Sequence, residues 1–322
     1  MRKPLLLLLA VLAAMIGTAF AQDNWPTKPI KLIAPFAPAS TPDTLARILA
    51  EGLRKRLGQP VVVENKAGGA GMIGTDAVAK AAPDGYTIGL SVVGPLANNA
   101  LLYKKMPYNP ERDLIPVTVA VNQPSLLVVR SDLPATNLSE LIADLKKRPG
   151  KGNYASIGNG SLSHLTMELV ATRSGTQIVH VPYAGSSQAV MAVVSGEVDM
   201  ACLPALAVKP FIQSGKLRAL GVTTARRSAL LPSIPTLREQ GLTDVDAGAW
   251  IGVVAPAGTP GAIVDRLYRE IGAVLKDPAT EKLLAQQMME VVGTSPQAFA
   301  ALLQNERARW KPVIVANGIH LD

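Results

Sequence analysis

Short hydrophobic runs alternate with amphipathic stretches along most of the chain. From Ile30 onward the short runs are rich in β-branched residues and are bounded by Gly, Pro or Asn, which is typical of strands. The stretches between them repeat apolar residues at helical spacing. Strands that alternate with helices predict an α/β fold with mostly parallel sheets. The expected strands cover residues 31–34, 61–64, 87–92, 126–129, 154–157, 178–181, 219–223 and 251–255.

Three of the expected helices have clear end signals. In the first, Thr41 is the expected N-cap and Gly58 ends the apolar pattern, as is usual for a glycine beyond a helix. In the second, Asn137 and Glu140 have the spacing of a capping box. The third begins at Ser295. All three present one apolar face, so we expect them to cover the core from the surface.

The first residues have the layout of a cleavable secretory signal. Arg2 and Lys3 precede an apolar run over residues 5–16, and Ala-Phe-Ala follows at 19–21. An uncleaved membrane anchor is the alternative, but this run is shorter than the roughly 20 residues that span a bilayer. We therefore expect cleavage after the signal at 1–21 and a mature protein in the periplasm.

The length predicts two domains. The chain has 322 residues, and the mature part exceeds the usual size of one domain. No flexible linker separates two blocks, so we expect the domains to interleave as two lobes. Residues 117–121 and 217–223 are the candidate hinge strands. The expected division places 22–122 and 226–322 in lobe 1, and 123–225 in lobe 2.

Charge and cysteine content exclude several functions. The formal net charge of +8 includes two residues of the expected signal, and the basic residues are spread over helices without interleaved aromatics. This favours solvated helix faces and gives no reason to expect a nucleic acid partner. Cys202 is the single cysteine, so no internal disulfide can form. The three histidines and scattered carboxylates have no ligand spacing, and we expect no metal site.

Four loops of small residues each follow an expected strand and lead into an expected helix. A helix start offers unpaired backbone N–H groups and the positive end of the helix dipole, which suit a bound carboxylate. One such loop is equally consistent with an ordinary βα turn. Four of them, in both expected lobes, favour a carboxylate site between the lobes, because ligands bind at the carboxyl ends of strands. The loops cover residues 35–43, 67–74, 156–164 and 181–189.

Two sharper interpretations of these loops find less support. Gly69, Gly71 and Gly74 match GxGxxG, but no strand ending in an acid follows about 20 residues later, so a dinucleotide site is disfavoured. Ser161 and His164 share a helix face and could suggest a hydrolase. The chain has no GxSxG elbow, and a positive histidine is disfavoured near a helix N-terminus. We expect His164 to be a neutral hydrogen-bonding residue.

The order of these motifs resembles one family over essentially the whole mature chain, the substrate-binding components of tripartite tricarboxylate transporters, also called Bug proteins. Many segments in one order make the resemblance specific. The segments that carry it are residues 25–30, 34–38, 43, 57–65, 81–87, 158–161, 164–165, 180–183, 185, 196–200, 215–220 and 255–260.

The resemblance implies a type II periplasmic binding fold, with two lobes of mixed, mostly parallel sheets joined by two hinge strands. It also implies that the protein is no enzyme, needs no cofactor, encloses a small carboxylate and delivers it to a two-component membrane permease. We expect a monomer. Carried over residue by residue, the expected ligand contacts are Phe36, Ala39, Ser40, Thr41, Asp43, Gly69, Ala70 and Gly71 in lobe 1, and Ser156, Asn159, Gly160, Ser161, His164 and Tyr183 in lobe 2.

Two departures from the family pattern bear on the ligand. Ala39-Ser40 stands where the family usually has Gly-Gly, and Cys202-Leu203-Pro204 stands where relatives often have Phe-Asp-Asn. The second change predicts a more apolar wall, which would favour an aliphatic or aromatic carboxylate over one that carries an amino group. The identity of the carboxylate stays open. A periplasmic protein that presents its ligand to a sensor kinase needs the same closure, so this alternative function also stays open.

Overall fold

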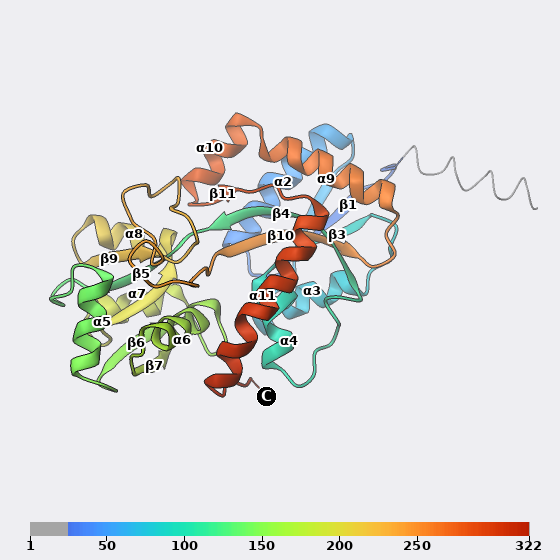
Figure 1. Cartoon of the computed structure of the whole chain (residues 1–322). Coiled ribbons are helices and arrows are strands. Elements are labelled where there is room, and N and C mark those ends of the chain that lie inside the picture. The colour runs from blue at the N-terminus through green and yellow to red at the C-terminus, as the bar shows by residue number, and fades with distance from the viewer. Residues whose placement is uncertain (1–24, 322) are drawn as a thin grey trace, which may run out of the picture.

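Two separate β-sheets organise the chain (Figure 1). The computed structural model describes residues 25–321, so the expected signal at 1–21 lies outside the described residues. The six-stranded sheet has the order β11-β4-β10-β3-β1-β2, and we call it and its helices lobe 1. Its strands are β1 (Ile30–Ala34), β2 (Val61–Asn65), β3 (Thr87–Val92), β4 (Leu114–Gln123), β10 (Ala249–Pro256) and β11 (Glu290–Val291).

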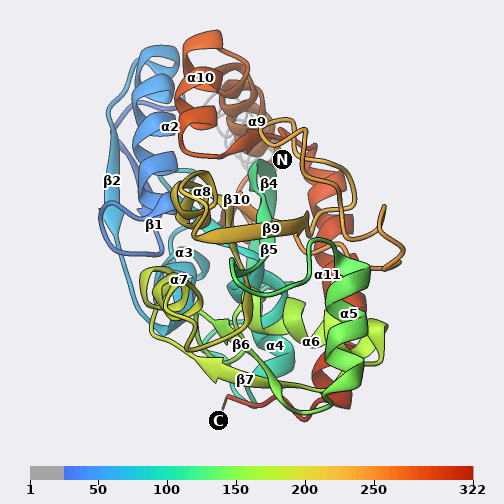
Figure 2. The ribbon, with the colours of Figure 1, turned by 90° about the vertical axis from the view of Figure 1, so that its left-hand side faces the viewer.

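The five-stranded sheet has the order β7-β6-β8-β5-β9, and we call it and its helices lobe 2. Figure 2 shows α2, α9 and α10 at one end of the molecule, and β6 and β7 toward the other. The strands of lobe 2 are β5 (Ser125–Arg130), β6 (Gly152–Ser156), β7 (Ile178–Pro182), β8 (Met200–Pro204) and β9 (Leu217–Val222).

Helices cover both sheets. Those that follow the strands of lobe 1 are α2 (Thr41–Leu57), α3 (Met72–Ala79), α4 (Asn99–Leu102), α9 (Gly261–Leu275), α10 (Pro278–Gln286) and α11 (Pro296–Ala316). Those that follow the strands of lobe 2 are α5 (Leu138–Lys147), α6 (Leu162–Ser174), α7 (Ser186–Val194) and α8 (Ala205–Gln213). Among residues 25–321, no helix has the length and apolar character needed to cross a membrane.

The chain crosses between the sheets twice. It passes from β4 to β5 at Pro124, and it returns between β9 and β10 through residues 223–248. The candidate hinge stretches, 117–121 and 217–223, lie almost wholly inside β4 and β9, the strands that lead into the two crossings. Part of the returning segment, which the sequence division assigned to lobe 1, adds Leu237 and Leu242 to the core of lobe 2.

Helix α11 packs on both lobes. Its first half buries Phe299 and Leu303 in a core cluster of lobe 1, whereas Trp310 and Ile314 of its second half are buried with α6 and β6 of lobe 2. Figure 1 shows this red helix running from one lobe toward the other. The last helix therefore connects the two lobes by packing, in addition to the two crossings of the chain.

Both sheets are mixed, because they contain antiparallel pairs as well as the parallel pairs that the sequence predicted. Pairing is parallel where β1 meets β2 and β3, and where β6 meets β7 and β8. The strands next to the crossings, β4, β5, β9 and β10, form antiparallel pairs. In a βα unit the connecting helix returns the chain to the amino-terminal edge of the sheet, so the next strand runs parallel. A strand that enters from the other lobe begins at the opposite edge, and it therefore runs antiparallel to its neighbours. The candidate loops follow strands that make parallel pairs.

The helix caps correct one prediction and confirm two. Ser40, not Thr41, caps α2, because Ser40 is extended and its Oγ accepts from the N–H of Asp43 at 3.4 Å, while Thr41 is already helical. Asn137 caps α5 through the N–H of Glu140, as expected. Ser295 caps α11, also as expected.

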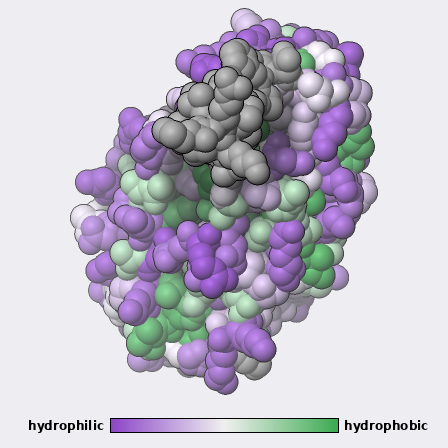
Figure 3. Space-filling model, turned by 90° about the vertical axis from the view of Figure 1, so that its right-hand side faces the viewer, coloured by the Kyte–Doolittle hydropathy of each residue, from purple (hydrophilic) through white to green (hydrophobic). Residues whose placement is uncertain are grey.

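On the face of the molecule in Figure 3, hydrophilic residues are distributed widely between smaller apolar areas.

Candidate functional site

The candidate loops of each lobe leave one edge of its sheet. In lobe 1, β1 runs parallel to β2 and β3, so the loops after these strands begin side by side. In lobe 2, β6 runs parallel to β7 and β8, with the same result for the loops after these strands. Both arrangements place small residues at the carboxyl ends of strands, where open α/β sheets bind ligands.

Asp43 holds the first loop of lobe 1 in shape. Asp43 is 2% exposed, and its carboxylate accepts from the N–H of Ala39 at 2.9 Å, from Nδ2 of Asn65 at 2.9 Å and from Nε of Arg47 at 3.0 Å. Burial raises the pKa of Asp43, but these hydrogen bonds and the Arg47 charge outweigh burial and lower it. Since these partners occupy both carboxylate oxygens, we assign Asp43 the task of positioning the loop.

The second loop of lobe 1 packs against the first. All residues from Gly68 to Gly71 have positive φ, including Ala70 at 52°. At Gly71 a Cβ would lie 3.1 Å from the Phe36 ring and 3.1 Å from Pro95, and the φ of 94° would strain any other residue, so the position favours glycine. The structure thus brings Phe36 and the 69–71 turn together, as the sequence predicted.

The matching loop of lobe 2 is closed by its own hydrogen bonds. The N–H of Gly160 donates to Nδ1 of His164 at 3.0 Å, and Ser161 Oγ donates to the carbonyl of Gly158 at 2.6 Å. Ser161 Oγ also accepts from the N–H of His164 at 3.3 Å, which makes it the N-cap of α6. Neither residue is arranged as a nucleophile and its base, because the hydroxyl and the ring are bonded to backbone.

Beneath this loop lies a stack of aromatic rings. The His164 and His180 rings are nearly parallel, 9° apart, with centroids separated by 3.9 Å, and Tyr154 stacks on His180 at 5.0 Å. His180 Nε2 lies 2.6 Å from Oγ of Ser156, which also accepts from the N–H of Gly158 at 3.1 Å. Burial and the neighbouring His180 lower the pKa of His164 to about 4, and burial also lowers the pKa of His180. Both rings are therefore neutral at pH 7.

Tyr183 lies next to Ser156 through its backbone, because its N–H donates to the Ser156 carbonyl at 3.0 Å, but its side chain is bonded elsewhere. Its ring packs with Ala155 in the core on the α7 side of the sheet, whereas Tyr154 belongs to the core on the α6 side. Its hydroxyl donates to Glu197 at 2.9 Å, a residue that precedes β8. Burial, followed by this bond, raises the pKa of Tyr183 to about 12. In the described structure the hydroxyl is thus bonded to Glu197 and not to the 158–161 loop.

Several polar side chains at the loops have no hydrogen-bond partner among residues 25–321. In lobe 1 these include the hydroxyl of Thr41. Ser40 Oγ accepts a hydrogen bond from the N–H of Asp43, but its own proton is donated to no group among the described residues. In lobe 2 the Asn159 amide and the hydroxyls of Ser186 and Ser187, at the start of α7, have no partner among the described residues. These neutral donors could bind an anion.

Sequence reasoning missed the segment that follows β3. A π-helical turn, Gly94–Asn98, begins there, and Pro95 lies against Gly71. Asn98 and Asn99 are 1% and 4% exposed, and Asn98 Oδ1 and Asn99 Nδ2 have no hydrogen-bond partner in the described part of the chain. The signal was available, because Gly94-Pro95 directly follows an expected strand in the same way as the loops that were selected.

The changed segment 202–204 does not form the apolar cleft wall that we expected. Cys202 and Leu203 are 1% and 0% exposed, and successive residues of a strand point to opposite faces. Cys202 packs in the core on the α6 side and Leu203 in the core on the α7 side. Of the three residues, Pro204 lies at the strand end, as the N-cap of α8.

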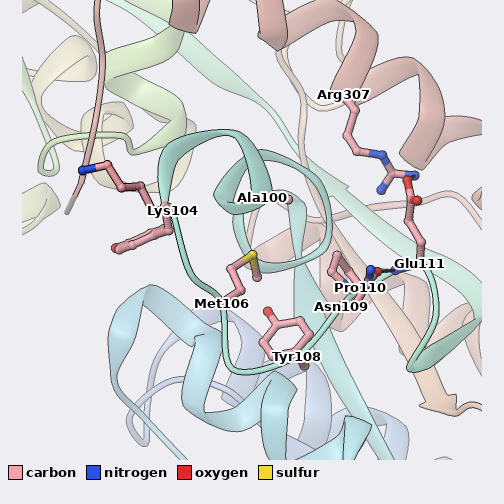
Figure 4. A pocket seen from close by; sticks show the side chains of 9 residues that line it. Ala100, Lys104, Met106, Tyr108, Asn109, Pro110, Glu111 and Arg307 are labelled. Atoms are coloured by element: carbon pink, nitrogen blue, oxygen red, sulfur yellow. Dashed lines mark hydrogen bonds and ion pairs between the residues drawn. The ribbon is translucent and has the colours of Figure 1, made fainter.

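Three cavities in the described part of the chain are lined by none of the expected ligand contacts. The first, about 420 Å³, lies between α6, α11 and the returning segment. The second, about 300 Å³, is shown in Figure 4, where Arg307 of α11 reaches Glu111 and lies across from Met106 and Tyr108. The third, about 220 Å³, shares Pro110, Glu111 and Arg307 with it. The candidate site therefore rests on the loops at the carboxyl ends of the parallel strands in each lobe.

No group of three or more His, Cys, Asp or Glu side chains within residues 25–321 could hold a metal ion. The site is therefore described by its backbone groups, hydroxyls and amides.

Comparison with known proteins then decides the family. Residues 45–319 match the tripartite tricarboxylate transporter family receptor. The chain belongs to this family.

Relatives and solved structures agree with this family over nearly the full chain. BugT of Bordetella pertussis is 39% identical, covering 98% of each chain. A protein of R. palustris solved with adipate has a TM-score of 0.80 at 36% identity, covering 92% of this chain and 99% of that one. MatC of Rhodopseudomonas palustris, solved with bound malate, has a TM-score of 0.75 at 32% identity, covering 90% and 100%. The predicted Bug family and two-lobe α/β binding-protein fold are confirmed.

Proposed function

We propose that this receptor captures a small carboxylate between its two lobes in the periplasm and delivers it to a two-component membrane permease. The observation that carries the proposal is the pair of serine-capped helix starts, α2 in lobe 1 and α6 in lobe 2, at the carboxyl ends of parallel strands. Solved relatives hold adipate and malate, which supports a carboxylate as the ligand class.

The proposed ligand contacts are the groups whose hydrogen-bonding capacity is still available. In lobe 1 they are Ser40, Thr41 and the backbone of the 69–71 turn, with Phe36 as an apolar contact. In lobe 2 they are Asn159 and the start of α6, together with the hydroxyls at the start of α7. Asp43, Ser156, Ser161 and His164 would shape the loops. The protein would act as a monomer without a cofactor.

A thermal-shift screen of small carboxylates tests the ligand class. Adipate, malate, citrate and aspartate are the probes, and a ligand at 100 times its dissociation constant should stabilise the native state by about 2.7 kcal/mol. At least one of the carboxylates should raise the melting temperature, while the matching amides should not. No shift with any carboxylate would contradict the proposal. Recovery of unchanged ligand after long incubation is the expected result for a receptor, and turnover would indicate an enzyme.

Deletion of the gene separates transport from signalling. Loss of ligand uptake by cells supports delivery to a permease. Unchanged uptake together with lost induction of ligand-responsive genes would instead support presentation of the ligand to a sensor kinase. Both outcomes require binding, so this experiment follows the thermal-shift screen.

A further inference from the structure

The helix starts of the two lobes share one local design. In lobe 1, Ala39 has a φ of 63° and its N–H donates to the side chain four residues later, Asp43. In lobe 2, Gly160 has a φ of 69° and its N–H donates to the side chain four residues later, His164. A serine stands between donor and helix in both lobes and caps the helix. Asp43 and His164 therefore occupy equivalent places.

One turn further along, each helix carries a charged residue next to its acceptor, and the two residues have opposite charges. Four residues beyond Asp43, Arg47 pairs with it at 3.0 Å. Four residues beyond His164, the Glu168 carboxylate lies 3.9 Å from its Nε2. In lobe 1 the acceptor is thus an anion with a cationic neighbour, whereas in lobe 2 it is an imidazole with an anionic neighbour.

This difference imposes a condition on His164 that Asp43 does not share. An imidazole accepts at Nδ1 only when it is neutral with its proton on Nε2. A second proton would place an N–H at Nδ1 opposite the N–H of Gly160, and two donors cannot bond. Protonation of His164 would therefore break the bond that closes the loop.

Groups from three elements surround the ring. Tyr154 of β6 donates to Glu168 of α6, and His180 of β7 stacks on His164 at 3.9 Å. The 157–163 loop contributes no titratable side chain, and the residues that pack against Gly160 are Leu102 and Leu321. Glu168 favours a charged imidazole, while burial and the second imidazole oppose it.

His180 supports the same loop from the neighbouring strand. Its Nε2 lies 2.6 Å from Ser156 Oγ, and Ser156 Oγ accepts from the N–H of Gly158. The two stacked rings thus reach the loop at both of its glycines, through His164 at Gly160 and through Ser156 at Gly158. A charge on either ring would face the other ring at van der Waals distance.

We propose that His164 and His180 are positioning residues, which as a neutral stacked pair hold the 158–161 loop in the shape that receives the ligand. The assignment rests on the proposed function for its link to affinity, although its effect on the loop can be measured without ligand. It predicts that lobe 2, and not lobe 1, makes ligand affinity sensitive to acid.

The ligand-free protein provides the first test, by amide exchange and histidine nitrogen shifts in NMR. At pH 6, His164 should be neutral with its proton on Nε2, and the Gly160 amide should be protected. His164→Leu should reduce that protection at least tenfold, and His164→Asn should keep most of it because its amide oxygen can replace Nδ1. His320→Asn, an exposed histidine, is the control and should change nothing.

Calorimetry with the best carboxylate from the screen provides the second test. At pH 7, His164→Leu should weaken binding by about tenfold, whereas His164→Asn and His320→Asn should stay within about twofold of wild type. Between pH 6 and pH 4, wild type should lose affinity more steeply than His164→Asn. The carboxylate also titrates in this range, so the difference between the two proteins is the readout.

The outcomes separate the positioning role from the proposed function. A charged His164 at pH 6, an unprotected Gly160 amide in wild type, or equal affinities of wild type and His164→Leu would each overturn the positioning role. If no carboxylate binds wild type while the NMR results are as expected, the ligand class is wrong but the histidine pair still positions the loop.

Discussion

The helix starts at α2 and α6 solve the same structural problem with different chemistry. Each must close a tight loop by giving a partner to the N–H of a residue with positive φ, Ala39 or Gly160. Lobe 1 uses the buried Asp43 carboxylate, whose charge is balanced by Arg47 and which also accepts a hydrogen bond from the Asn65 amide. Lobe 2 uses the neutral His164 ring within a stack of rings. In both lobes, local acceptors thus maintain the loop shape, and this leaves neutral groups available for the proposed ligand.

Removing the charged acceptor should have the largest effect on this comparison. Asp43→Ala leaves the N–H of Ala39 and the Asn65 amide without their acceptor, and we expect a loss of about 2–3 kcal/mol of unfolding free energy. Chemical denaturation measures it. Asp265→Ala, an exposed acid on α9, is the control and should stay within about 0.5 kcal/mol of wild type. An equally small effect at Asp43 would mean that the carboxylate does not hold the loop.

The second-largest effect should be a loss of stability in acid, which arises in lobe 2. The pKa of His164 is about 4 in the folded protein against about 6.5 in an unfolded chain. The unfolded state therefore binds the proton first as pH falls, so stability is complete above pH 6.5 and decreases toward pH 4. Allowing for partial solvent screening, we expect about 2 kcal/mol from this residue. Denaturation curves of wild type and His164→Asn between pH 7 and pH 4 should diverge, and parallel curves would contradict the assignment.

Loss of either serine cap should have a smaller effect than these two changes. Ser40→Ala and Ser161→Ala each remove the acceptor for an N–H of the first helical turn, at a cost of about 1 kcal/mol. Ser161 also donates to the carbonyl of Gly158 at 2.6 Å, so its replacement should cost more. Melting temperatures of both variants measure the order. A larger loss at Ser40 would indicate that the additional bond in lobe 2 contributes nothing.

The smallest expected effect is a gain. Ala39 has a φ of 63°, a conformation that costs an alanine about 1 kcal/mol. Ala39→Gly removes this strain but increases the freedom of the unfolded chain. We expect a net stabilisation of a few tenths of a kcal/mol, measured by denaturant midpoints. A loss of stability would show that the Ala39 methyl group has favourable contacts.

Local sequence signals predicted the strands and caps well, within limits. Every expected strand is present, while β8 and β11 were missed and β4 was regarded only as a hinge. β8 reads Met-Ala-Cys-Leu-Pro and contains no β-branched residue, so its sequence does not indicate a strand. Ser40 was one residue from the expected cap, because a threonine and a serine in succession can both serve as caps.

The candidate site was harder to predict, because hydrogen-bond partners that are distant in sequence decide each role. Asp43, Ser161 and His164 were predicted as ligand contacts, whereas in the structure their side chains are hydrogen-bonded to neighbouring residues. His180 was not selected, since its contact with Ser156 depends on the register of β6 and β7. Tyr183 was selected, although its side chain lies on the other face of the sheet.

The sequence by itself determined the alternation of strands and helices, the positions of the glycines at the loops and the family, because these depend on residues close together in the chain. Only the tertiary structure decided which polar groups remain free for a ligand. A hydroxyl, carboxylate or imidazole can either contact a ligand or hold the backbone. The choice depends on which donors and acceptors the packed strands and helices bring within hydrogen-bonding distance.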